Sequence, residues 1–436
     1  MPPKKVSIIT LGCAKNQVDT ENLAGLLKKR GYEIDANPEN ADAIVVHTCS
    51  FIEAAKRESV ETILGAARLK GDKKKLIVTG CMVQQHGKEM LEELPEVDAF
   101  LGTGQLAQVP DFLDKPRARF LDRTNPGGLM DPDAPRLLKN TGPTANLRLS
   151  EGCSHPCSFC VIPKLRGGVQ SRPEETILTE AKQLAAQGIE ELVIIGQDTG
   201  DWGRDLYPDK RLPSLLRRLR DIQGVRWIRL MYMHPHSFSD ELLNLFAESP
   251  ETFPYLDMPL QHIDHAMLME MKRKLGETEL RALLDKIHAR LPNLSLRTTF
   301  IVGFPGETDA QFERLLNFVK EGHFNHLGAF TYSQEEGTPA GIRTDQISDE
   351  VKKARQVAIT EAHFDIAHKK AAGRLGSTET ILLEDTEGDT VLGRSRYEAP
   401  EVDAIIRLPK KAARLGQFVQ ARLTGYDAYE YTAEPA

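Results

Sequence analysis

Apolar and polar residues alternate along the first hundred positions in a pattern that predicts strands separated by helices. Short, β-branched apolar runs occur at residues 6–10 (VSIIT), 43–48 (AIVVHT) and 75–80 (KLIVTG). Apolar residues recur at helical spacing over 18–30, 51–70 and about 83–93. Strands that alternate with helices in this way predict a doubly wound sheet of parallel strands.

A similar alternation begins again near residue 146 and is typical of an incomplete β/α barrel. Six apolar runs predict its strands, at 146–150, 191–196, 225–230, 255–259, 296–304 and 326–332. Helical patterns lie between them, for example at 174–187 and 308–321. Six such units are fewer than the eight of a closed barrel. We therefore expect a partial (β/α)6 barrel whose chemistry lies at the carboxyl ends of the strands.

Two changes of pattern divide the chain. Residues 115–145 hold five prolines and three glycines without an apolar period, which indicates a linker or irregular segment. After a charged helix over about 347–370, which we expect to be solvated, about sixty residues form short strands with polar turns. The predicted domains are an α/β domain at 1–115, a linker at 116–143, the barrel at 144–372 and an all-β module at 373–436.

Composition and charge exclude some classes of protein. Among the 436 residues 40% are apolar and 27% charged, and the net charge is −7, which argues against a binder of polyanions. The start, MPPKKVSIIT, has too short an apolar run for a signal peptide, and no run of about eighteen apolar residues predicts a membrane span. Six cysteines without a secretory signal indicate the reducing cytoplasm, where clustered cysteines bind metal or do chemistry.

The six cysteines form two sets of three. One set lies in the loop EGCSHPCSFC after the first predicted barrel strand, and consists of Cys153, Cys157 and Cys160. In the other set each member lies just past one of the first three strands, at Cys13, Cys49 and Cys81. Parallel strands end at one shared edge, so this second set is expected to converge. Neither set can gain a fourth thiolate without taking one from the other.

Three thiolates leave a metal site incomplete. A 4Fe-4S cluster normally has four thiolates, so with three of them one iron stays open for another ligand. A catalytic zinc also combines three protein ligands with an open position, and His155 in the loop keeps zinc as an alternative. We expect His155 to face solvent instead. For Cys13, Cys49 and Cys81 the alternative is three buried structural cysteines.

The loop, with its C-x-x-x-C-x-x-C spacing and Phe159 before the last cysteine, resembles the radical SAM superfamily. The resemblance implies a 4Fe-4S cluster whose open iron binds the amino and carboxylate groups of S-adenosylmethionine (SAM). One electron from the cluster then breaks the sulfonium bond and yields a 5′-deoxyadenosyl radical. TFIVGFPGE (299–307) is similar to the glycine-rich strand end of that family. This implies Gly303, Glu307 and Gln261 as contacts of SAM, while Arg166 either meets its carboxylate or lies on the surface.

Further motifs resemble the methylthiotransferase family over nearly the whole chain. LGCAKNQVDTE, TCSFIEAAKRES and VTGC are similar to its N-terminal domain, YLDMPLQH and EEGTPA to its radical SAM core, and the tail to its TRAM module. The resemblance implies that Cys13, Cys49 and Cys81 hold a second 4Fe-4S cluster, also with an open iron. It also implies two SAM molecules for each reaction, and a low-potential electron donor such as flavodoxin or ferredoxin.

Two branches of this family differ in substrate. One modifies isopentenyl-adenosine in tRNA, and the other an aspartate β-carbon of ribosomal protein S-twelve. CSFIEAA and APEVDA (399–404) resemble the second branch. From Gly376 onward the tail has seven Lys or Arg and eleven Asp or Glu, and an acidic module suits a basic protein better than RNA. His47 departs from the Asn expected before Thr-Cys, which affects only a contact near Cys49.

Other classes of protein remain as alternatives. A ferredoxin-like electron carrier would use cysteines but would not need a barrel that binds SAM. A zinc-containing RNA-binding protein would contain zinc in place of iron and sulfide. The resemblance favours the methylthiotransferase, which attaches a CH3–S group to an unactivated carbon, a step that needs a radical supplied by the cofactor.

Overall fold

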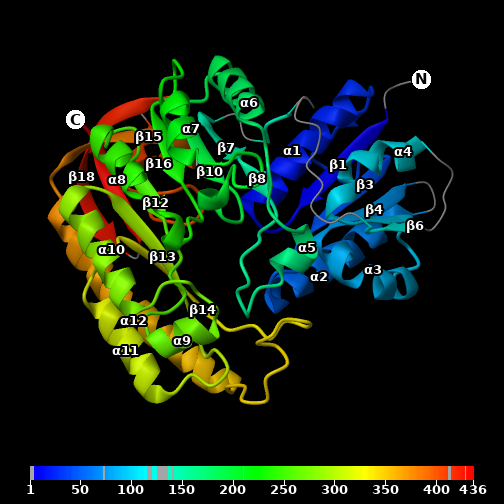
Figure 1. The fold of residues 1–436 in the computed structure, drawn as a ribbon. Coiled ribbons are helices and arrows are strands. Elements are labelled where there is room, and N and C mark those ends of the chain that lie inside the picture. Colours follow the sequence, from blue (N-terminus) through cyan, green and yellow to red (C-terminus); the bar gives the residue numbers. More distant parts are fainter. Residues whose placement is uncertain are drawn as a thin grey trace.

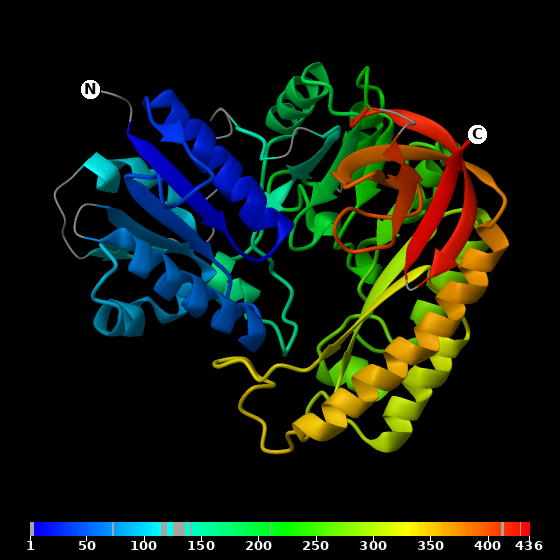
Figure 2. The ribbon, with the colours of Figure 1, turned by 180° about the vertical axis from the view of Figure 1, so that it is seen from behind.

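The chain folds into an α/β domain, an open barrel and a small closed barrel (Figure 1; Figure 2 shows the reverse side). The computed structural model describes residues 4–71, 74–114, 120–124, 136–139, 142–209, 211–410, 414–427 and 429–436. The predicted fold class is confirmed in all three parts. Within the described ranges, no helix has the length and apolar character that crossing a membrane requires.

The first unit is a parallel six-stranded sheet in the order β2-β1-β3-β4-β5-β6. Its strands are β1 (Lys5–Thr10), β2 (Glu33–Ile34), β3 (Ala43–Thr48), β4 (Lys75–Gly80), β5 (Ala99–Leu101) and β6 (Phe120–Asp122). Its helices are α1 (Ala14–Lys29), α2 (Glu53–Lys70), α3 (Cys81–Glu93), the 3-10 helix η1 (Thr103–Gln108) and α4 (Val109–Asp114). Val45 packs towards α1 and α4, and Val46 towards α2 and α3, because successive strand residues alternate sides. The order reverses between β1 and β3, which opens a crevice at their carboxyl ends.

The second unit is an open sheet of six parallel strands in the order β14-β13-β12-β11-β10-β7. Its strands are β7 (Thr144–Arg148), β10 (Glu191–Ile195), β11 (Trp227–Leu230), β12 (Tyr255–Asp257), β13 (Ser295–Val302) and β14 (His326–Thr331). The helices are α5 (Ile162–Arg166), α6 (Glu174–Ala186), α7 (Leu212–Arg220), α8 (Asp240–Glu248), α9 (His265–Glu270), α10 (Glu277–Arg290) and α11 (Asp309–Lys320). Short elements complete it, namely β8 (Ser150–Glu151), β9 (Gln170–Ser171), η2 (Thr199–Asp201) and η3 (Pro235–Ser237). One large apolar cluster fills the space between the sheet and its helices.

Part of the predicted linker belongs to the first sheet, because β6 pairs with β5. The rest of that stretch lies largely outside the described residues, at 115–119, 125–135 and 140–141. After it, Arg136 forms ion pairs of 2.6 Å with Glu21 on α1 and 2.8 Å with Glu180 on α6. The connection is therefore fastened to both neighbouring units.

The third unit begins with the long helix α12 (Asp349–Arg374), which runs beside α11 in both views. It leads into a closed barrel in the order β15-β16-β17-β19-β18. The strands are β15 (Thr378–Glu387), β16 (Thr390–Ser395), β17 (Ile405–Pro409), β18 (Phe418–Asp427) and β19 (Glu430–Pro435). Closure of the sheet leaves no unpaired edge strand.

Buried charges fasten the closed barrel to the interior of the open one. Arg229 pairs with Glu191 and donates to the carbonyl oxygens of Ser395 and Arg396, at 3.0 Å and 2.8 Å. Glu191 also pairs with Arg394 at 2.6 Å. Burial opposes ionisation of Glu191, but Arg394 and Arg229 outweigh it and lower its pKa to about 2. Removing the closed barrel would therefore leave charged groups of the open barrel without partners.

Candidate functional site

Three cysteines lie at the carboxyl ends of adjacent strands of the first sheet. Cys13 begins α1 after β1, Cys49 follows β3, and Cys81 begins α3 directly after β4. The turn at Gly12 has a φ of +90°, and a Cβ there would lie 2.7 Å from the Cβ of Cys49. Only glycine permits this approach. The sequence prediction that strand ends bring these cysteines together is therefore confirmed by the sheet order.

The second cysteine set lies in a loop that is held from several sides. Gly152 has a φ of +72°, and a Cβ there would lie 2.1 Å from the carbonyl oxygen of Gly168. The Cys153 amide donates to Gly167 O at 3.1 Å. Ser158 donates to the end of α9 at 3.2 Å and accepts, at 2.9 Å, from the segment after β14. Cys153, Cys157 and Cys160 are thus fixed at the mouth of the open barrel before any ligand binds.

The thiols differ in how readily they lose their protons. Burial, together with the neighbouring cysteines of each set, raises the pKa of Cys49 to about 11 and that of Cys160 to about 12. Burial also opposes ionisation of Cys13, but the charges of Lys15 and Arg166 lower its pKa overall. Metal binding requires thiolates, so a metal at either set would displace protons from buried thiols.

The spacing of the thiols fits a group larger than one ion. A tetrahedral zinc site with Zn–S bonds near 2.3 Å places its sulfur atoms about 3.7 Å apart. Among the described residues, one group of His, Cys, Asp or Glu side chains is compact enough to hold a single ion. It consists of His155, Asp198 and Asp201, whose ligand atoms all lie within 4.8 Å of one another. Neither cysteine set is that compact. An iron–sulfur cluster, in which each thiolate binds a different iron, suits the wider spacing.

His155 does not face solvent, which corrects the expectation from the sequence. Its side chain is buried, and Nε2 lies 2.6 Å from Asp198 and 3.3 Å from Asp201. Its ring stacks on that of His234, with centroids 4.5 Å apart. His155 therefore anchors the cysteine loop to the segments that follow β10 and β11.

Arg166 lies beside the set formed by Cys13, Cys49 and Cys81. It is buried at the end of α5 and pairs with Asp19 at 3.2 Å and with Glu151 at 3.0 Å. The negative charges of Cys81, Glu151 and Asp19 raise the pKa of Arg166 despite its burial. This excludes the surface position, which was one of the two alternatives that the sequence left open for Arg166. The guanidinium ties the α/β domain to the barrel at the cysteines.

Apolar contacts bring the two sets together as well. Val161 and Leu165, in and next to α5, pack against Cys81. The Thr103 hydroxyl donates to Leu165 O at 2.8 Å. Because α5 begins just after Cys160, one short helix separates the two cysteine sets.

Several buried polar atoms at the carboxyl ends of the barrel strands have no hydrogen-bond partner among the described residues. They are Ser150 Oγ, Gln197 Oε1, Asp257 Oδ1 and Gln261 Oε1. Gln261 also has a φ of +75°, and its backbone N–H donates to Thr299 O at 2.8 Å. Buried polar groups are normally hydrogen-bonded, so these atoms fit a polar ligand such as SAM at the mouth of the barrel.

The other predicted SAM contacts have protein partners here. Glu307 is buried, with one carboxylate oxygen 3.1 Å from His262 Nε2 and the other bonded to Arg355, at 2.8 Å, and to the Gly303 amide. A Cβ at Gly303 would lie 2.3 Å from Lys352 Cγ on α12. Contact of Gly303 and Glu307 with SAM stays a prediction. Their observed role is to brace the turn after β13, and Arg355 shows that α12 is not simply a solvated helix.

Asp257, at the end of β12, makes stability depend on pH. Burial raises its pKa to about 6. The positive charge of Arg297 opposes this rise only in part, because Arg297 also pairs with Asp403. A carboxyl with a raised pKa stabilises the folded protein fully below pH 4, and this contribution is lost as the pH rises through 6. Asp257→Asn should therefore raise stability at pH 7.5 relative to wild type, by up to about 3 kcal/mol, and by about half as much at pH 5.

Thermal unfolding at the two pH values measures this difference. Asp285→Asn, at an exposed position on α10, is the matched control and should change neither value. Equal pH dependence of wild type and Asp257→Asn would contradict the raised pKa.

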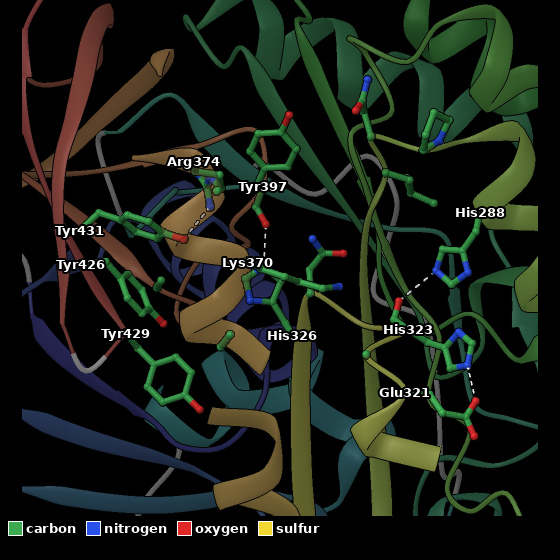
Figure 3. Close-up of a pocket in the computed structure, with 18 residues that line it drawn as sticks. His288, Glu321, His323, His326, Lys370, Arg374, Tyr397, Tyr426, Tyr429 and Tyr431 are labelled. Atoms are coloured by element: carbon green, nitrogen blue, oxygen red, sulfur yellow. Dashed lines mark hydrogen bonds and ion pairs between the residues drawn. The ribbon is translucent and has the colours of Figure 1, made fainter. Parts of the chain in front are cut away.

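A cavity of about 570 Å³ lies at the other end of the barrel, at the start of β13 and β14 (Figure 3). None of the six cysteines lines it. Its charged groups have internal partners, since Arg374 pairs with Glu379 and Glu398, and His326 donates to Tyr397 O. This cavity is a seam between α12, the open barrel and the closed barrel, and the chemistry is at the opposite end.

Models of three protein families match the chain in sequence order. An uncharacterized protein family, UPF0004, matches residues 5–102, the radical SAM superfamily matches 147–319, and the TRAM domain matches 375–435. These ranges correspond to the three units of the fold.

Curated relatives match over the full length. The chain is 40% identical to the ribosomal protein uS12 methylthiotransferase RimO of Desulfitobacterium hafniense, over 99% of this chain and 98% of the relative. It is 42% identical to the protein of the same name from Anaeromyxobacter, over 99% and 92%.

Among solved structures, the fold is similar to radical S-adenosylmethionine enzymes. The methyltransferase TsrM from Kitasatospora setae aligns with a TM-score of 0.53 and 16% identity, covering 78% of this chain and 77% of that chain. The cobalamin-dependent enzyme OxsB aligns with a TM-score of 0.51 and 11% identity, covering 84% and 56%. At these identities the likeness shows the fold alone.

Proposed function

Because the chain belongs to the RimO family of radical SAM methylthiotransferases, we propose that it attaches a methylthio group to the β-carbon of an aspartate in ribosomal protein uS12. The observation that carries this proposal is that α5, which begins just after Cys160, packs on Cys81 and so joins the two three-cysteine sets. One set suits the generation of a radical and the other suits the supply of sulfur. A simple electron carrier would need neither the barrel nor the unpartnered polar atoms at its mouth.

The enzyme is a transferase that uses SAM and two 4Fe-4S clusters. We assign one cluster to Cys153, Cys157 and Cys160, and the second to Cys13, Cys49 and Cys81. When bound, SAM and the first cluster supply the carbon-centred radical that abstracts hydrogen, and the second cluster carries the sulfur that is methylated. The residues of the chain hold these groups at the carboxyl ends of strands in the two sheets.

Three further assignments belong to the same proposal. We place the enzyme in the cytoplasm, with flavodoxin or ferredoxin as its electron donor. The predicted domain boundaries at 115, 143 and 372 also belong to this proposal, although β6 extends the first sheet past residue 115. Gln261, whose Oε1 is buried without a partner, is the most suitable of the three predicted SAM contacts.

The acidic face of the closed barrel would meet the basic ribosomal protein. Not all of its acids are available, because Glu384 pairs with Arg394 and Glu387 with Arg407. Asp385 and Asp389 are exposed and form no ion pair with any residue that the structure describes. These two residues, rather than the whole acidic run, carry the charge open to a partner. Deleting the module is a poor test, because it also removes buried partners of Arg229 and Glu191.

Asp385→Lys combined with Asp389→Lys should slow association with the ribosomal protein by about tenfold at low salt, because attraction of opposite charges speeds encounter. The difference should shrink as salt is added, since exposed charges are screened over about 8–10 Å at physiological ionic strength. Stopped-flow association rates at several salt concentrations measure the effect.

The matched control carries the same change in charge on α12, with Glu361→Lys and Asp365→Lys, both at exposed positions. It should associate at nearly the wild-type rate. If both double variants slow association equally, net charge rather than docking through the closed barrel governs the encounter.

The function itself is tested by mass spectrometry in cells with and without this chain. Ribosomal protein uS12 should gain the mass of one methylthio group in place of hydrogen only when the chain is present. tRNA should show no change. Gain of methylthio groups on tRNA nucleosides instead would establish the tRNA-modifying alternative.

A further inference from the structure

Lys15 is a buried lysine without an acidic partner. Its side chain is on α1, and the residue is only 8% exposed. The ammonium donates to Gly196 O at 3.3 Å and lies 3.8 Å from the centroid of the Tyr232 ring. Across the described chain, no carboxylate oxygen comes within 4.0 Å of Lys15 Nζ. Cys13 and Glu151 act on the charge of Lys15 without a direct hydrogen bond or ion pair to it.

The nearby buried cations are different. Arg148 pairs with Asp19 and Glu151, and Arg166 pairs with the same two acids. A buried ammonium without an anionic partner is costly, because the carbonyl and the ring replace only part of its lost hydration. Because Lys15 lacks an acidic partner while both neighbouring arginines have one, its ammonium indicates a binding site for an anion.

The position of Lys15 relates it to the reaction. It follows Cys13 by two residues, and Gly196 and Tyr232 follow the carboxyl ends of β10 and β11. The ammonium therefore lies at the mouth of the barrel, next to the turn that carries Cys13. Tyr232 has a φ of +56°, which is strained for a bulky residue, and its amide donates to Asp257 at 3.1 Å. Such strain persists where surrounding contacts hold a side chain in a required place.

On the basis of the proposed function, we propose that Lys15 binds the side-chain carboxylate of the substrate aspartate. The reacting β-carbon is bonded directly to that carboxylate carbon. A salt bridge there would fix the β-carbon at the mouth of the barrel and would supply the anion that Lys15 lacks. Lys15 is thus the residue that selects aspartate over a neutral side chain of the same shape.

Two other anions compete for this role, and the test separates them. SAM has a carboxylate, but in the radical SAM superfamily the open iron engages it. The cluster assigned to Cys13, Cys49 and Cys81 is itself negatively charged, so Lys15 could balance that charge. In that case its loss would shift the reduction potential of this cluster and leave the choice of substrate unchanged.

The test compares binding of two forms of ribosomal protein uS12, one with the target aspartate and one with asparagine in its place. Full-length enzyme with both clusters is used anaerobically, with SAM and no reductant. Wild type should bind the aspartate form at least about tenfold more tightly, and Lys15→Met should bind both forms equally. Lys15→Arg, which keeps the charge, should retain a preference. Lys29→Met, at the exposed far end of α1, is the control and should behave as wild type.

Iron content and the spectra of both clusters show that each variant is loaded and folded. A preserved preference for aspartate in Lys15→Met overturns the inference, and a shifted potential of the second cluster would then assign Lys15 to balancing its charge. Equal binding of the two forms by wild type also overturns it. Failure of wild type to bind or modify the ribosomal protein at all overturns the proposed function, and the inference falls with it.

Discussion

Changing Cys153, Cys157 and Cys160 together to alanine should remove about half of the iron and abolish cleavage of SAM. The loop that carries these cysteines is held by Gly152, Ser158 and His155 without help from a ligand, so its backbone should survive the change. Two four-iron clusters predict about eight irons per chain in the wild type and about four in the variant. Iron and sulfide analysis, with detection of 5′-deoxyadenosine, measures both effects.

The complementary variant changes Cys13, Cys49 and Cys81. It should also lose about half of the iron, but SAM cleavage should continue while transfer of the methylthio group stops. These cysteines end strands of a separate sheet, and the barrel does not depend on them for its strands. Full iron content in this variant would show that the second cluster does not exist as proposed.

Much of the fold follows from local pattern. The β-branched runs at 43–48 and 75–80 became β3 and β4 with the same bounds, because such runs bury both faces in a parallel sheet. All six barrel strands were predicted, to within a few residues at their ends. The short strands β5 and β6 were missed, because three residues carry too little periodicity and β6 lies in a proline-rich stretch.

The site was predictable only in part. Spacing and strand ends pointed to the six cysteines, since both are properties of the chain itself. His155 was wrongly expected to face solvent, and Arg166 was left between two alternatives, because their partners Asp198 and Asp19 are far away in sequence. Lys15 gave no signal, because a lysine on a helix is normally solvated and only the approach of β10 and β11 buries it. Contacts between units cannot be read from the pattern within either unit.

Arg166→Met should destabilise the junction between the α/β domain and the barrel by about 3–5 kcal/mol. Arg166 pairs with Asp19 and Glu151, and removing one member of a buried ionic group leaves the others uncompensated. Its charge also lies beside Cys13 and Cys81, so the second cluster should bind less firmly. Arg166→Lys keeps the charge but not the planar fork, so it should recover only part of the loss.

Thermal unfolding and the iron retained after gel filtration measure the two effects. The control is Arg57→Met on α2, whose arginine side chain is 76% exposed and pairs with Glu53 at 3.6 Å. An exposed pair contributes under about 1 kcal/mol, so this variant should unfold like wild type. If Arg166→Met unfolds like the control and keeps all its iron, the buried guanidinium does not hold the two cysteine sets together. Loss of iron from the Cys13, Cys49 and Cys81 set alone would instead place its main effect on the second cluster.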